Sequence, residues 1–175
     1  MTLFLAALLF APQAAIPPQE EVDTYAIYSL LLKDELSRRT GESTPAIIRQ
    51  TERGRLPMCV HPPADQKAIY TSLTGDFESK NARSFTLEAK LDLSTYKFIP
   101  REDAAAFLKE NPRSGVVLEV SAPGYNADRS RALVYVGHRC GSLCGGGTYH
   151  LLVKREGKWQ RDTEFRGGPF CAWVS

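Results

Sequence analysis

The order of helix-like and strand-like segments along this chain predicts an α+β fold, with N-terminal helices packed on one face of a C-terminal antiparallel sheet. Apolar side chains recur at three- and four-residue spacing between Val22 and Leu36, as on one side of a helix. After Gly115 the chain instead alternates short β-branched and aromatic runs with turns. Because successive strands joined by short turns pair antiparallel, the second half predicts a meander of four or more strands.

Three helices are predicted: one that ends near Gly41, one at 64–80 and one at 101–110. The first should bury a single stripe formed by Val22, Tyr25, Ser29, Leu32 and Leu36. The second is indicated by the four-residue spacing of Ile69, Leu73 and Phe77. A short strand, a proline-rich loop and an extended or irregular stretch are expected at 45–51, 57–63 and 87–99.

The strand candidates of the second half are 116–120, 132–136, 148–153 and 159–165, and residues 170–175 can extend the edge of the sheet. The last hairpin turns at Gly157 and places Trp159 directly after the turn. This ending resembles the closing hairpin of NTF2-like and cystatin-like folds. The resemblance implies a curved sheet that rolls around a helix.

Length and composition indicate one ordinary domain. The chain has 175 residues, of which 43% are hydrophobic and 24% charged, as is typical of soluble globular proteins. Lys and Arg exceed Asp and Glu by only two, so the formal charge is +2. A nucleic-acid-binding surface normally needs a larger basic excess, so we expect no nucleic-acid partner.

The N-terminal segment predicts export. Residues 2–11 form an uncharged apolar run that is followed by small residues and prolines, as in a secretory signal of about residues 1–15. About ten apolar residues are too few to cross a bilayer, which needs about twenty, so no membrane association is expected after removal of the signal. The mature domain would then be residues 16–175, in the periplasm or outside the cell. No Lys or Arg precedes the run, which leaves a buried helix of a cytosolic protein as the alternative.

Outside the cytosol, four cysteines usually form two disulfides, and three pairings are possible. We expect Cys140 to bond Cys144, because a β-hairpin already brings the ends of this short loop close together. Cys59 and Cys171 are then paired by elimination.

The same loop carries the two enzymatic alternatives, a metal site or a thiol–disulfide exchange site. His138, Cys140, Cys144 and His150 are residue types that suit zinc. Alternation along the strands, however, is expected to turn the two imidazoles to opposite faces of the sheet, so we predict no metal or other cofactor. Gly145, Gly146 and Gly147 predict a flexible hairpin tip, without the helix N-terminus that lowers the pKa of redox-active thiols.

The expected function is therefore binding of a small molecule or a protein, or an accessory role, with no catalytic residue assigned. The binding surface would be the concave face of the sheet or the disulfide-closed loop. Candidate ligand-facing side chains on these elements are Tyr125, Tyr135, His138, Tyr149 and Trp159.

A longer motif runs through the C-terminal part of the chain. The chain carries Ala-Leu-Val-Tyr-Val at 132–136, Cys-Gly-Ser-Leu-Cys-Gly at 140–145 and Gly-Lys-Trp at 157–159. With Leu-Leu-Val-Lys at 151–154, this run resembles a group of uncharacterised exported bacterial proteins. The resemblance covers about the last third of the chain and implies a secreted or periplasmic bacterial protein with a β-rich end and no assigned activity.

Overall fold

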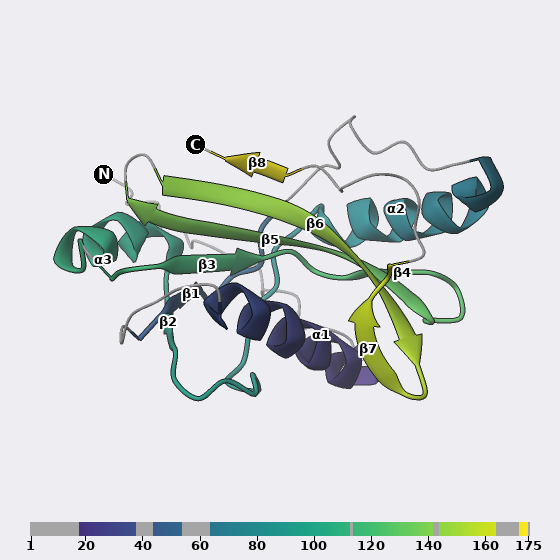
Figure 1. Ribbon diagram of the computed structural model, residues 1–175, viewed down its shortest axis with the longest axis horizontal. Coiled ribbons are helices and arrows are strands. Elements are labelled where there is room, and N and C mark those ends of the chain that lie inside the picture. Colours follow the sequence, from purple (N-terminus) through teal and green to yellow (C-terminus); the bar gives the residue numbers. More distant parts are fainter. Residues whose placement is uncertain are drawn as a thin grey trace, which may run out of the picture.

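A computed structural model describes residues 18–37, 44–53, 64–112, 114–141, 144–163 and 172–174 of the chain. Within these ranges the fold is α+β, as predicted, with three α-helices and an eight-stranded mixed sheet (Figure 1). The helices are α1 (Pro18–Ser37), α2 (Lys67–Asn81) and α3 (Ala104–Glu110), and short 3₁₀ turns (Ala64–Gln66 and Arg101–Asp103) precede α2 and α3. The strands are β1 (Ala46–Ile48), β2 (Lys97–Ile99), β3 (Val117–Val120), β4 (Gly124–Tyr125), β5 (Arg131–Gly141), β6 (Cys144–Arg155), β7 (Lys158–Arg161) and β8 (Ala172–Val174). The expected signal segment lies outside the described residues, and none of the helices described is long and apolar enough to cross a membrane.

The long β5–β6 hairpin is the spine of the sheet. β3 and β4 pair with the edge of β5 that faces away from β6. β7 and β8 pair with the edge of β6 that faces away from β5. All of these pairings are antiparallel, so the predicted meander and its C-terminal extension are confirmed. β1 joins β3 in parallel and β2 joins β1 in parallel, which makes the sheet mixed. These two parallel strands lie outside the predicted meander, because β1 and β2 come from the helical half of the chain and reach the sheet through crossovers.

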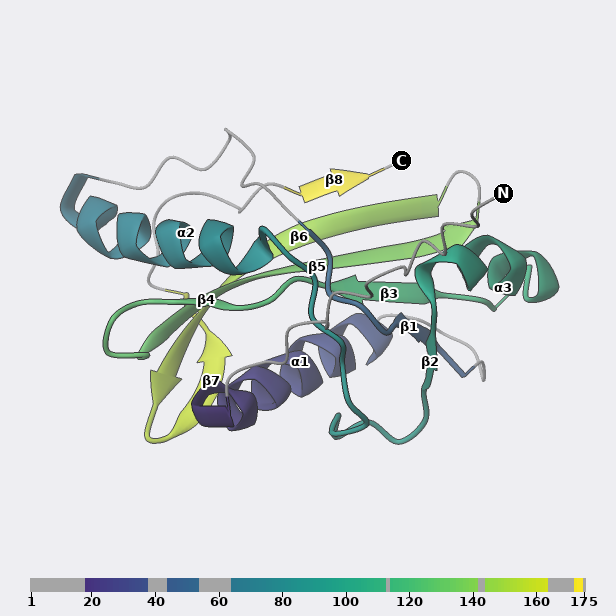
Figure 2. The ribbon, with the colours of Figure 1, turned by 180° about the vertical axis from the view of Figure 1, so that it is seen from behind.

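Both faces of the sheet are covered by helices, rather than one face as expected. α1 packs on the face that carries Leu118, Val134 and Leu152, and α2 packs on the opposite face against Leu133 and Leu151. Figures 1 and 2 show α1 and α2 on opposite sides of the β5–β6 hairpin. α3 covers β1, β2 and the start of β3 on the same face as α2. Alternate side chains of one strand therefore pack into two separate apolar cores, one under α1 and one under α2.

The three glycines after Cys144 belong to β6 and are buried, which corrects the prediction of a flexible tip. Gly145, Gly146 and Gly147 pair with Arg139, His138 and Gly137 of β5, and β8 pairs with the other edge of the last two. The sequence pattern was misleading because glycine is common in loops but also occurs in strands where other backbone approaches closely.

α2 docks on the sheet through close backbone contact and buried hydrogen bonds. A Cβ atom at Gly124 would lie 2.5 Å from both the backbone nitrogen and the Cβ atom of Phe77 in α2. Asn81, at the end of α2, exchanges two hydrogen bonds with the backbone of Ala122, at 2.8 and 2.9 Å. The backbone N–H of Tyr125 donates to Asp76 Oδ2 at 2.7 Å. The hydrogen bonds thus fix the position of α2, and the missing side chain at Gly124 allows the helix to come this close to the sheet.

Replacement of that glycine should destabilise the protein. We expect Gly124→Ala to lower the free energy of unfolding by about 2 kcal/mol, because the contacted backbone of α2 cannot move aside easily. Gly75→Ala is the matched control: a Cβ atom at this exposed position in the same helix meets nothing within 4 Å, so alanine should stabilise α2 by about 0.5–1 kcal/mol. Urea unfolding followed by circular dichroism measures both values. Equal stability of Gly124→Ala and wild type would contradict the close contact.

Candidate functional site

The structure contains the predicted disulfide between Cys140 and Cys144, which joins the end of β5 to the start of β6 with a Cα–Cα distance of 5.1 Å. Both cysteines lie on strands rather than in the first turn of a helix. A disulfide placed in this way closes the end of the β5–β6 hairpin. Cys59 and Cys171 lie outside the described residues, so their pairing stays a prediction.

The two histidines lie on the same face of the sheet, which corrects the expectation of opposite faces. His150 pairs with Val134, so both side chains point toward α1, as does that of His138 four pairs further along. The error came from assuming that the apolar partners of His150 on β6 face the same core as Val134, whereas they face the core under α2. His138 Nδ1 lies 3.2 Å from Glu35 Oε1, and His150 Nδ1 is hydrogen bonded to Arg161. Among the described residues, no three His, Cys, Asp or Glu side chains are arranged to hold a metal ion.

The aromatic residues proposed to face a ligand are divided between the two cores. Tyr125 and Trp159 pack together under α1, with ring centroids 5.9 Å apart. Tyr135 and Tyr149 pack together under α2, with ring centroids 5.1 Å apart. Each of these four residues is no more than 8% exposed. Burial, the neighbouring Tyr135 and the Glu52 carboxylate raise the pKa of Tyr149 to about 12. The structure therefore does not bring the four rings and His138 together in one groove.

A buried charge network on the α2 face was not predicted. Glu119, on β3, has a side chain only 8% exposed, and its Oε2 accepts hydrogen bonds from Arg101 and Arg139, each at 3.0 Å. Arg101 also forms an ion pair with Glu52. Burial and the Glu119 carboxylate raise the pKa of Glu52, against the opposing effect of both arginines. A Cβ atom at Gly137 would lie 2.7 Å from Glu119 Oε1, so this carboxylate occupies the space that a side chain would need.

A second unpredicted cluster fixes α1 to the β6–β7 hairpin. Asp23 Oδ1 accepts hydrogen bonds from Lys154 Nζ at 2.7 Å and from Trp159 Nε1 at 2.9 Å. Burial alone would raise the pKa of Asp23, but these hydrogen bonds and the nearby charges of Lys154 and Arg129 outweigh burial and lower the pKa below 3.8. The carboxylate is thus held in its charged form at the first turns of α1.

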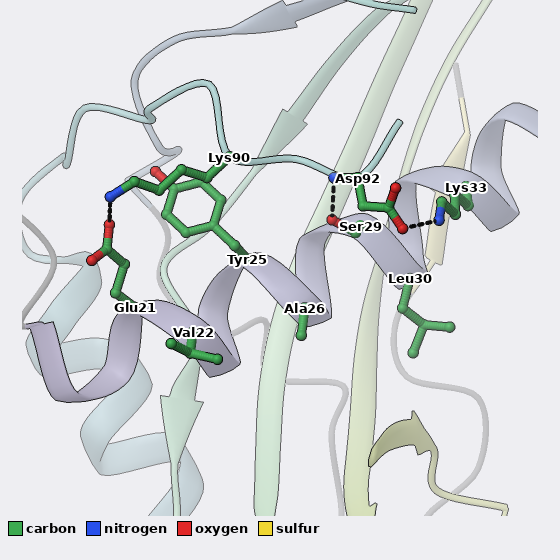
Figure 3. A pocket seen from close by; sticks show the side chains of 9 residues that line it. All are labelled: Glu21, Val22, Tyr25, Ala26, Ser29, Leu30, Lys33, Lys90 and Asp92. Carbon is green, nitrogen blue, oxygen red and sulfur yellow. Dashed lines mark hydrogen bonds and ion pairs between the residues drawn. The ribbon is translucent and has the colours of Figure 1, made fainter. Parts of the chain in front are cut away.

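A hollow lies along α1, beside the segment 88–92 that follows α2. It is a groove of about 770 Å³ lined mainly by apolar atoms, from Glu21, Val22, Tyr25, Ala26, Ser29, Leu30, Lys33, Lys90 and Asp92. Figure 3 shows Tyr25 and Ser29 pointing to segment 88–92, whereas Val22, Ala26 and Leu30 follow one another on the other side of the helix.

Two hydrogen bonds hold the second wall of this groove. The backbone N–H of Glu88 donates to Tyr25 Oη at 2.6 Å, and that of Asp92 donates to Ser29 Oγ at 2.9 Å (Figure 3 draws the second). Ion pairs cross the rim, from Lys33 to Asp92 at 2.6 Å and from Lys90 to Glu21. Contacts within the chain therefore hold segment 88–92 beside α1.

The outer side of α1 departs from the sequence prediction. Val22, expected in the buried stripe, is 81% exposed, whereas Ile27, Tyr28 and Leu31 are almost completely buried. The other residues of the predicted stripe were placed correctly, because Tyr25, Ser29 and Leu32 are buried and Leu36 packs against the core. The signal that could have found the groove is the four-residue spacing of Val22, Ala26 and Leu30.

The Asp23 cluster leads to a prediction of pH dependence. In the unfolded chain Asp23 should titrate near 3.8 and in the folded protein below it, so its stabilisation is present above pH 3.8 and is lost as the pH falls through the folded pKa. We expect Asp23→Asn to cost about 1–3 kcal/mol of unfolding free energy at pH 7. The difference from wild type should shrink as the pH falls below 3.8 and through the folded-state pKa.

The matched control for that measurement is Asp92→Asn, which removes an ion pair whose carboxylate is 87% exposed. We expect it to cost no more than about 0.5 kcal/mol at any pH. Urea unfolding of both variants between pH 2.5 and 7, values that bracket the ordinary Asp pKa of about 3.9, makes the comparison. An Asp23→Asn deficit that stays constant at acid pH would contradict the assigned charge state.

Comparisons with known proteins add no family to this description. No family model matches the chain, and neither a characterised protein nor a solved structure matches it. The geometry of its own residues is what supports a function.

Proposed function

We propose that this chain is an exported binding domain, without catalysis of its own, that holds a segment of another polypeptide against α1. The observation that carries the proposal is the apolar series Val22, Ala26 and Leu30, hereafter the α1 ridge, which lines the groove. Val22 and Ala26 are exposed, and Leu30 is partly buried against the core. Contiguous exposed apolar surface with a polar rim is typical of a protein interaction site.

The shape of the groove favours a polypeptide over a small molecule. Small-molecule sites enclose most of the ligand surface, whereas this groove is open along the length of a helix. The α1 ridge repeats every four residues, which is the spacing by which helices pack side by side. An amphipathic helix is the type of segment that such a surface recognises.

The preorganisation of the groove also favours a binding function. Tyr25 and Ser29 bond the backbone of segment 88–92, so the two walls keep their separation. A surface that is already ordered loses little conformational entropy on binding, and more of the contact energy contributes to affinity.

The described residues give less support to the enzymatic alternatives. Cys140 and Cys144 are joined in a strand hairpin, and His138 and His150 have separate partners in Glu35 and Arg161. A thiol–disulfide or metal-dependent enzyme centred on this loop would need free thiolates or converging ligands.

Export, to the periplasm or the outside of the cell, is part of the proposal. The apolar segment at 2–11, the disulfide and the resemblance of residues 121–159 to exported bacterial proteins support it. We expect mass mapping of non-reduced peptides to find Cys140 linked to Cys144 and Cys59 linked to Cys171. Free thiols at these positions in protein isolated from its native compartment would contradict export to an oxidising environment.

Photo-crosslinking tests the binding surface. We expect p-benzoylphenylalanine in place of Val22 to form a discrete covalent adduct with a polypeptide in cells of the source organism, because Val22 lies on the α1 ridge. The adduct should be lost when Leu30→Lys is added, since this change places a charge at the other end of the ridge.

The matched control carries the same photoreactive residue in place of Ile69, another exposed apolar side chain, in α2. It should give no adduct. Absence of an adduct from position 22, or equal yields from both positions, would contradict the proposal.

A further inference from the structure

We infer that a small pocket between α1 and the end of α2 binds a short-chain carboxylate, such as propionate or butyrate, with its charged group against Arg83. This pocket shares no lining residue with the groove beside the α1 ridge, so the inference does not depend on the binding of a polypeptide. Three features support it: the size and apolar lining of the pocket, the saturation of most of its polar groups by contacts within the chain, and a guanidinium group at its opening.

The pocket has the size of a small organic molecule. Its volume is about 120 Å³, and it lies between Glu20 and Thr24 of α1, Lys80 of α2 and the segments 83–85 and 122–123. Most of the lining atoms are apolar. A cavity of about 150 Å³ can hold benzene, so this pocket has room for a molecule of about five or six non-hydrogen atoms.

The apolar walls of the pocket are held in place by hydrogen bonds. The backbone of Ala122 exchanges two bonds with the side chain of Asn81, and the backbone N–H of Phe85 donates to Thr51 Oγ1 at 2.9 Å. Phe85 and Ala122 are no more than 4% exposed. A ligand that enters between such walls meets a preorganised surface, which lowers the conformational cost of binding.

Most of the polar groups of the pocket are bonded within the chain. Lys80 Nζ lies 2.7 Å from Glu20 Oε2 and 2.8 Å from Asp76 Oδ2, and Thr24 Oγ1 shares a hydrogen bond with Tyr125 Oη at 3.0 Å. An ordered buried water usually needs about three polar partners. Because these groups are occupied and the remaining lining is mainly apolar, the pocket favours the hydrocarbon part of a ligand over water.

Arg83 supplies the charge that a carboxylate would recognise. Its side chain is exposed, so it marks the opening of the pocket, and its Cζ lies 5.5 Å from the ring centroid of Phe85. Within the ranges that the structure describes, no carboxylate pairs with Arg83, whereas Lys80 pairs with two. A guanidinium group can donate two parallel hydrogen bonds to one carboxylate. A short acid therefore fits both parts of the site, with its charge at Arg83 and its hydrocarbon inside.

The expected binding is weak, because the ligand is small and its ion pair is exposed to solvent. We expect a dissociation constant of about 1–10 mM for butyrate. Such an affinity suits a metabolite that reaches millimolar concentration.

An NMR titration of residues 16–175, with the disulfide intact, tests the inference at constant ionic strength. Up to about 50 mM butyrate or propionate should cause saturable shifts of the backbone amides of Lys80, Arg83 and Ala122. Hexanoate is too large for the pocket and butyramide has no charge, so each should bind at least about fivefold more weakly than butyrate. This series tests size and charge without altering the protein.

Three variants test the groups that surround the pocket. Arg83→Gln should weaken butyrate binding at least about fivefold and leave butyramide binding unchanged, because only the charged ligand uses the guanidinium. Glu20→Gln removes one of the two carboxylates that hold Lys80 and should strengthen butyrate binding about threefold. The matched control is Lys109→Gln, which removes a positive charge from an exposed position in α3 and should leave butyrate binding unchanged.

Four results would overturn the inference. They are shifts that do not saturate or that lie outside the pocket, equal affinity for butyramide and butyrate, equal affinity for hexanoate and butyrate, and an Arg83→Gln variant that binds butyrate as wild type does. None of these results bears on the photo-crosslinking at position 22, so the proposed polypeptide-binding surface would stand or fall separately.

Discussion

The structure depends on one constraint, the burial of both faces of the β5–β6 hairpin. Side chains alternate along a strand, so Leu133 and Val134 point to opposite sides and need two separate covers. α1 supplies one cover, and α2 with α3 supplies the other. Most of the polar contacts follow from this arrangement, because each helix has to be held at a fixed place above the sheet. Asp23 holds α1 to the β6–β7 hairpin, and Asn81 holds α2 to the backbone before β4.

The same constraint separates what the sequence could predict from what it could not. The three helices and most of the strands were placed correctly because spacing and turn residues are local signals, although the glycine-rich start of β6 was expected to be a loop. The pairing of Cys140 with Cys144 followed from the hairpin between them. Which face a residue occupies is not local. A strand with apolar side chains on both sides has no polar face to reveal its orientation, so the side toward which His150 points could not be read from its neighbours. Val22 was misplaced for a related reason, since apolar residues lie around most of α1.

The polar clusters show a second limit of sequence interpretation. Glu119 meets Arg101 across 18 positions and Arg139 across 20, and Asp23 meets Trp159 across 136. No spacing rule connects residues so far apart, because their proximity is a result of strand order. The charged form of a buried carboxylate such as Glu119 is stabilised by the ion pairs with Arg101 and Arg139. Removal of one arginine would leave part of that charge uncompensated in the protein interior. These clusters therefore depend on the correct fold and also discriminate against misaligned strands.

The functional argument is also a consequence of how α1 is held. One side of this helix is buried in the core, where Tyr28 donates a hydrogen bond to the backbone oxygen of Ser121 at 2.9 Å. A second side bonds segment 88–92 through Tyr25 and Ser29. A helix restrained on two sides cannot rotate to hide Val22, although burial of a valine side chain is worth about 1.5 kcal/mol or more. The exposure of Val22 is therefore a fixed property of the part of the chain that the structure describes, and the proposed binding surface requires such a fixed side chain.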